Sequence, residues 1–178
     1  GLDADEACQL YIGLSMIAYR EEKIDQALEL AMTALRIADK SGEKRNTAQA
    51  RQTLGILYWK KEDFFKAIEV DHQSLAVWRE LGNLYGQAAV HNNLGLLYQS
   101  LDDLAAAAHH FEQCVAAFEK VGNLHGLACA YDNLGRVQAQ LGDQEQVLAC
   151  LEKAVSILAK IGLNETQVYA SMWQSGTW

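Results

Sequence analysis

The sequence predicts an all-α fold, a solenoid built from consecutive antiparallel helix pairs. Its 178 residues contain no proline, so the residue type that most strongly interrupts a helix is missing from the chain. Glycines recur at a fixed interval of 40 residues, at Gly42, Gly82, Gly122 and Gly162. A column of small residues follows the same period, at Ala34, Ser74, Cys114 and Ala154.

The first helix of each pair is predicted from a repeated Leu-Gly-x-x-Tyr motif. Residues 53–58 read Thr-Leu-Gly-Ile-Leu-Tyr, and residues 93–98 repeat this as Asn-Leu-Gly-Leu-Leu-Tyr. The copy at residues 133–138 keeps Leu-Gly but ends in Gln138, and the first copy has Ser15 in place of the glycine. Apolar residues three to four positions apart along these segments indicate amphipathic helices.

The second helix of each pair is predicted to begin after an aspartate, at Asp63, Asp103 and Asp143. A carboxylate at this position accepts hydrogen bonds from the free amides of the first turn, and a glycine near the far end suits a left-handed terminus. Four repeats fit, at residues 8–47, 48–87, 88–127 and 128–167, and residues 168–178 begin a fifth first helix. A single pair cannot bury its apolar face, so we expect one continuous array over residues 1–178.

Composition and charge exclude several classes of function. The 23 acidic and 15 basic residues give a net charge of -8, which disfavours nucleic acids and anionic membranes as partners. No apolar stretch is long enough to span a membrane. The four cysteines lack CxxC spacing and lie among apolar neighbours, which indicates reduced thiols in a cytoplasmic protein. Without a phosphate-binding glycine motif or a nucleophile beside a base, we expect neither an enzyme nor a cofactor.

Two His-Cys pairs have a spacing that metal ligands on a helix can have. His110 and Cys114, and likewise His125 and Cys129, are four residues apart, a spacing that can place two ligands on one helix face. Cys114 belongs to the column of small residues, and Cys150 aligns with apolar residues of other copies. We therefore expect packing rather than metal binding.

The repeated motifs resemble the tetratricopeptide repeat family, and the resemblance covers essentially the whole chain. The period of 40 residues exceeds the usual 34, and the proline that normally ends the repeat is missing. The longer unit is similar to the extended repeats of Pins/LGN-type adaptors and of bacterial regulators with such repeats. The resemblance implies a right-handed superhelix that acts as a protein-binding scaffold.

The resemblance also implies a concave peptide-binding groove lined by the first helices. Its N-terminal half would present apolar and aromatic side chains, and its C-terminal half would present groups that bind a peptide main chain. The carboxylate clamp of cochaperone members is disfavoured, because Ile12 and Gln52 stand where the clamp needs a cation. The implied groove residues are Met16, Tyr19, Gln52, Ile56, Trp59, Asn92, Asn93, Leu96, Gln99, Asn133 and Arg136.

Two functions are consistent with this reasoning. The first is an adaptor that binds an internal, partly hydrophobic or basic segment of a partner protein. The alternative is a structural or regulatory domain of a larger signalling protein, which associates with its own copies through the groove or the C-terminal helix. The apolar groove residues also have an alternative role, as core between neighbouring repeats.

Overall fold

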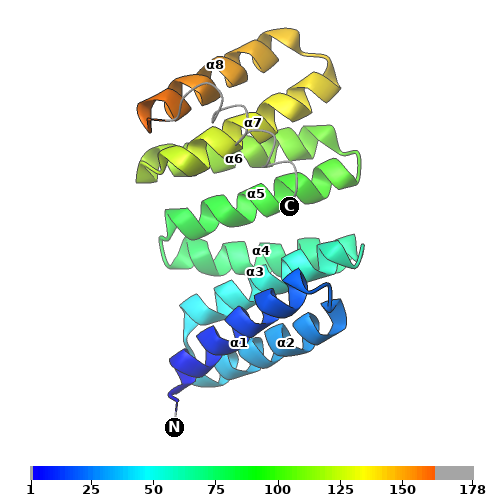
Figure 1. Ribbon diagram of the computed structural model, residues 1–178, viewed down its shortest axis with the longest axis vertical. Coiled ribbons are helices and arrows are strands. Elements are labelled where there is room, and N and C mark those ends of the chain that lie inside the picture. Colours follow the sequence, from blue (N-terminus) through cyan, green and yellow to red (C-terminus); the bar gives the residue numbers. More distant parts are fainter. Residues whose placement is uncertain (1, 163–178) are drawn as a thin grey trace. The chain divides into compact units, whose positions relative to one another are not determined.

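The computed structural model describes residues 2–162, which form eight α-helices and, within that range, no strand (Figure 1). First and second helices alternate along the chain, which confirms the all-α array of helix pairs. The expected fifth first helix at residues 168–178 lies outside the described residues. In chain order the helices are α1 (Ala4–Arg20), α2 (Ile24–Ser41), α3 (Lys44–Lys60), α4 (Phe64–Glu80), α5 (Leu84–Ser100), α6 (Leu104–Val121), α7 (Leu124–Leu141) and α8 (Gln144–Lys160).

The helix pairs keep the expected period but begin four residues before the expected repeat boundaries. The first helices begin at Ala4, Lys44, Leu84 and Leu124. Side-chain caps set three of these starts, and at α5 Asn83 accepts a hydrogen bond from the amide of Gly86 at 2.9 Å. Asp3 accepts a hydrogen bond from the amide of Glu6 at 2.8 Å, and Asn123 accepts one from the amide of Gly126 at 2.9 Å. Each cap satisfies a free amide of the first turn and so fixes where its helix begins.

The aspartates predicted to start the second helices do cap them. Asp63, Asp103 and Asp143 each accept a hydrogen bond from the backbone amide three residues later, at 3.3, 3.0 and 3.1 Å. Helices α2 and α6 end at Gly42 and Gly122, whose φ angles of 75° and 68° are left-handed. Glycine adopts this conformation without a steric penalty, so the recurring glycines do terminate helices.

The chain divides into two compact units, residues 1–93 and residues 94 onward, and the division falls inside α5. In the first unit α1 packs on α2, α3 packs on α4, and α2 also packs on α3. One core cluster of this unit joins α1, α2 and α3. Its buried members are Ala18, Ala27, Leu28, Ala31, Leu54 and Leu57.

The second unit repeats the same packing. Helix α7 packs on α8, and α6 packs on α7. Gly95 of α5 allows a close approach to α6, because a Cβ at this position would lie 2.6 Å from the ring of Phe111. Among the helices of residues 2–162, none has the length and apolar character needed to cross a bilayer. The buried core cluster of this unit contains Ala107, Ala108, Phe111, Leu134, Val137 and Cys150.

Candidate functional site

The first helices α1, α3, α5 and α7 keep one face accessible in every repeat. The columns that begin with Met16, Tyr19 and Arg20 are half-buried or exposed in all four copies. The column that begins with Ser15, by contrast, is buried in all four copies. Each first helix therefore packs through one face and leaves a second face accessible to a ligand.

Helices α1 and α3 carry the aromatic and apolar residues expected to bind a peptide. Met16, Tyr19, Ile56 and Trp59 are all half-buried, as is Gln52 beside them. Tyr19 packs against the core cluster of the first unit, so it serves the helix packing that was considered as its alternative role. Met16, Ile56 and Trp59 are not members of that cluster and retain exposed area for a ligand.

Helix α5 carries Asn92 and Asn93 where the first unit ends, and both are half-buried. The Nδ2 atom of Asn93 is buried and has no hydrogen-bond partner among residues 2–162. Leaving a buried donor unpaired costs about 1–3 kcal/mol. The Asn93 amide is therefore a group whose hydrogen-bonding capacity this part of the chain leaves unused.

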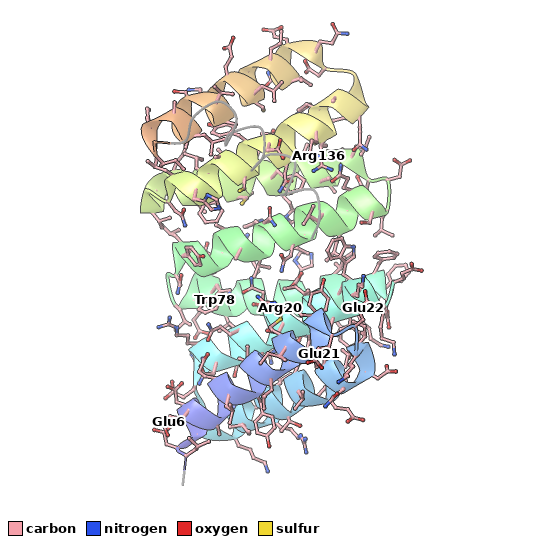
Figure 2. The ribbon with its side chains drawn as sticks, viewed as in Figure 1. Glu6, Arg20, Glu21, Glu22, Trp78 and Arg136 are labelled. Carbon is pink, nitrogen blue, oxygen red and sulfur yellow. The ribbon has the colours of Figure 1, made fainter. Side chains whose placement is uncertain are left out.

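In the second unit, the expected residues lie on α5 and α7. Leu96 is half-buried against the core cluster that contains Phe111, so part of its surface serves packing. The Nε2 atom of Gln99 donates a hydrogen bond to the Oε1 atom of Gln140 at 2.8 Å, which links α5 to α7. Asn133 is buried, whereas Arg136 is exposed on α7 (Figure 2).

The expected site residues thus fall into two groups, because the division between the units follows Asn93. In the first unit they lie on α1 and α3, which contact each other, and on the start of α5. In the second unit they lie on the end of α5 and on α7. Within each unit, neighbouring first helices bring accessible polar and apolar side chains onto one helical face.

Asp71 on α4 is a fully buried carboxyl group that the sequence analysis did not single out. Its exposed fraction is 0%, and neither oxygen has a hydrogen-bond partner among the described residues. It faces Gly55 of α3, where a Cβ would lie 2.4 Å from Oδ1. Burial raises the pKa of Asp71 well above its ordinary value and favours the neutral acid. The sequence does contain a signal for this burial, because the equivalent positions in the other repeats hold the apolar residues Ala31, Phe111 and Leu151.

Three of the four cysteines are buried in the core. Within residues 2–162, no three His, Cys, Asp or Glu side chains gather as a metal site would need. Cys8, Cys114 and Cys150 are buried free thiols, and burial, with a smaller effect of Cys129, raises the pKa of Cys114 to about 12. The Cys114 thiol is therefore protonated at neutral pH and unreactive as a nucleophile.

A sequence profile of the tetratricopeptide repeat matches three overlapping segments, residues 6–80, 53–120 and 86–160. Together these segments include nearly all of the eight helices. Comparison with curated protein sequences gives no significant match. The motif-based resemblance is thus supported by an independent match along most of the chain.

Solved structures share the fold. BtubC (BKLC) from P. vanneervenii gives a TM-score of 0.81 at 25% identity, over 92% of this chain and 68% of that one. Aspartyl phosphate phosphatase F from Bacillus subtilis gives a TM-score of 0.88 at 16% identity, over 97% of this chain and 45% of that one. A Rap protein complexed with Competence and Sporulation Factor gives a TM-score of 0.83 at 20% identity, over 89% of this chain and 44% of that one. The chain spans less than half the length of the last two proteins.

Proposed function

Because the chain belongs to the tetratricopeptide repeat family of protein-interaction domains, we propose that its first helices bind an extended segment of a partner protein. The observation that carries the proposal is the accessible face of these helices. Its columns stay half-buried or exposed in every repeat, although the adjoining Ser15 column is buried in all of them. An accessible face that recurs on the neighbouring first helices of a unit suits a ligand that runs across those helices.

The side chains on this face define the chemistry of the ligand. Met16, Ile56 and Trp59 offer apolar and aromatic area, which suits hydrophobic anchor residues of the bound segment. The half-buried side chain of Asn93 adds an amide group beside this area, which suits the polar main chain of the same segment. The net charge of -8 favours a neutral or basic segment, because opposite charges accelerate and orient association.

Two further observations support a binding role. A Rap protein that shares this fold over 44% of its length has been crystallised in complex with Competence and Sporulation Factor. We propose no catalytic step, since the buried thiol of Cys114 is protonated and Asp71 is sealed in the core. We assign the protein to the cytoplasm, where its free thiols stay reduced.

The proposal is tested by selecting ligands for the full chain from a library of random extended peptides. The dissociation constant of a selected peptide is then measured for Trp59→Ala combined with Asn93→Ala. Losing an aromatic anchor and a polar amide group should weaken binding by about 30-fold or more. Phe65→Ala is the matched control, because Phe65 is 84% exposed on the second helix α4 and lies off the proposed surface.

The control should change the dissociation constant less than about twofold. Circular dichroism and thermal unfolding establish that all variants remain folded. Equal binding by the wild type and by the double variant would show that the peptide binds elsewhere and would overturn the assignment of this surface.

A further inference from the structure

Helices α1 and α3 carry the same three kinds of side chain at equivalent positions of their accessible face. Each helix presents an amide, then an apolar residue, then a cation, and all six side chains are half-buried or exposed. Spacings of seven and four residues place the three on one face of their helix. We name them the amide row (Gln9 and Gln49), the apolar row (Met16 and Ile56) and the cation row (Arg20 and Lys60).

Equivalent side chains of α1 and α3 are neighbours in space. The Nε2 atom of Gln9 donates a hydrogen bond to the Oε1 atom of Gln49 at 2.8 Å, so the two members of the amide row touch. Cα atoms of the two helices come within 8 Å of each other. The axes of packed helices lie about 8–10 Å apart. A ligand that crosses from Met16 to Ile56 therefore travels about that distance.

The distance between the two helices sets the spacing of the ligand side chains. An extended chain advances about 3.1–3.4 Å per residue, so three residues span about 9–10 Å. Two residues span only about 6–7 Å, and four span about 12–14 Å. A polyproline II chain has three residues per turn, so side chains three positions apart also point the same way. An extended ligand therefore reaches both members of the apolar row with side chains three positions apart.

The cation row is available to a ligand. Arg20 and Lys60 are exposed, and neither forms an ion pair with another residue of the range 2–162. Glu21, the acidic residue next to Arg20, pairs instead with Lys23 at 2.7 Å. Each cation lies one helical turn beyond a member of the apolar row. A carboxylate beside each apolar side chain of the ligand therefore complements this face.

Acidic residues near the cation row confine this attraction to direct contact. Glu22 lies at the same end of α1 as Arg20 (Figure 2), and Glu62 is equally exposed in the turn after α3. Salt screens exposed charges beyond about 8 Å. A ligand carboxylate is therefore attracted where it reaches Arg20 or Lys60, whereas the net charge of -8 disfavours it elsewhere. Acidic residues of the ligand belong beside the two apolar side chains, and the rest of the segment is neutral or basic.

The second unit does not repeat this arrangement. Ser100 and Gln140 occupy the positions equivalent to the cation row, and Gln140 accepts the hydrogen bond from Gln99. On α7 the position equivalent to the apolar row holds Arg136, which is charged and exposed. The combination of an apolar row with a cation row is thus a property of the first unit.

We propose that the first unit selects an extended segment with two apolar residues three positions apart, each beside an acidic residue. This inference rests on the proposed function and adds the spacing and the charge of the ligand. The two apolar residues contact Met16 and Ile56. The two carboxylates pair with Arg20 and Lys60, and the amide row offers hydrogen bonds to the main chain of the segment.

The spacing is tested with short peptides blocked at both ends, whose binding to the full chain is measured by calorimetry. The reference peptide, Ser-Gly-Leu-Glu-Ser-Leu-Glu-Ser-Gly, has leucines three positions apart, each followed by glutamate. Peptides of the same composition place the leucines two or four positions apart. The reference should bind about tenfold or more tightly than either, because only its leucines reach both helices. Equal binding of all three peptides would overturn the spacing.

The charge is tested by reversing it on each side of the contact. Lys60→Glu should weaken binding of the reference peptide about three- to tenfold at low salt and strengthen binding of a peptide with lysine in place of both glutamates. Lys40→Glu is the matched control, because Lys40 is also exposed in the last turn of its helix but lies on the second helix α2. It should change binding less than about twofold. A wild type that prefers the lysine peptide would overturn the acidic character of the ligand.

The outcomes distinguish this inference from the proposed function. Peptides selected from the random library may bind the accessible face, as judged by the Trp59→Ala and Asn93→Ala double variant, yet lack the predicted spacing and acidic residues. That result would overturn this inference and leave the proposed function standing. Apolar residues six or seven positions apart in the selected peptides would indicate a helical ligand, since a helix advances about 1.5 Å per residue. Absence of binding by every library and reference peptide would overturn both.

Discussion

Two helix pairs place different chemistry at the same contact of the repeat. In α3–α4, Gly55 faces Asp71, whereas in α5–α6, Gly95 faces Phe111 at the equivalent position. Both facing side chains have an exposed fraction of 0%. The phenylalanine ring is an apolar group in an apolar core, but the Asp71 carboxyl has lost its water without gaining a described hydrogen-bond partner.

The difference shows that the position within the repeat, more than the residue type, determines which side chain is buried. In α2, α4 and α6 the helix opposite closes this column, whether it holds Ala31, Asp71 or Phe111. The residue type then determines the free energy of that burial, which is favourable for the ring and unfavourable for the carboxyl. The α3–α4 and α5–α6 pairs thus share a backbone arrangement, but the buried side chain at this contact stabilises only the second.

Alanine substitutions at Phe111 and Asp71 should show the largest difference in stability between the two helix pairs. Phe111→Ala should lower the free energy of unfolding by about 3–5 kcal/mol, because it leaves a cavity in the second unit. Asp71→Ala should leave that free energy unchanged or raise it, because the same column already accommodates the fully buried Ala31. Urea unfolding followed by circular dichroism measures both values.

Phe65→Ala is the control for this comparison, since it removes the same ring from a position that is 84% exposed. It should change the free energy of unfolding by less than about 0.5 kcal/mol. Equal losses for Phe111→Ala and Asp71→Ala would mean that the carboxyl stabilises its pair as the ring does.

The pH dependence of stability should sharpen the same contrast. Burial raises the pKa of Asp71 in the folded chain, so above the ordinary carboxyl pKa of about 4 the folded state holds a proton that the unfolded state has released. Stability is then greatest at low pH. Asp71 should reduce the free energy of unfolding by about 1.4 kcal/mol per pH unit until the pH passes its raised pKa.

Asp71→Asn removes this titration while keeping the shape of the side chain. Urea unfolding at about pH 5 and about pH 7 should show that the stability of the variant relative to the wild type increases with pH. Parallel stabilities of the two proteins over this range would contradict the raised pKa.

Much of this fold follows from the repeat period. The period predicted every helix pair in the described residues, and the helix-capping role of aspartates such as Asp63 followed from simple hydrogen-bond chemistry. Such predictions succeed because helix starts and stops depend on local sequence. The first helices begin at Ala4, Lys44, Leu84 and Leu124, four residues before the expected repeat boundaries.

Packing against other elements was harder to predict. The period shows that Leu14 and Leu54 are equivalent, but only the structure shows that Leu54 is buried and Leu14 is 38% exposed. The burial of Asp71 was missed for the same reason, since an acidic residue on a helix is usually solvated. Tyr19 was assigned to the binding surface, yet part of it packs on the core. That the remaining residues of this surface bind a peptide stays a prediction.

The glycines opposite Asp71 and Phe111 provide the mildest test of the comparison. A Cβ at Gly95 would lie 2.6–2.8 Å from three atoms of the rigid Phe111 ring, so Gly95→Ala should lower the free energy of unfolding by about 1–3 kcal/mol. Gly55→Ala should cost less, because a short carboxyl reorients more easily than a ring and alanine favours the helix by about 1 kcal/mol.

Gly135→Ala is the control among the first helices, since its Cβ would meet the Cβ of Cys150 at 3.2 Å, a contact that a small shift relieves. Combining each glycine variant with alanine at the facing position distinguishes a steric clash from a propensity effect. Alanine at Phe111 should reduce the cost of Gly95→Ala, whereas the combined Gly55→Ala and Asp71→Ala variant should be at least as stable as the wild type. Additive effects at Gly95 and Phe111 in urea unfolding would show that their contact does not determine how closely α5 and α6 approach.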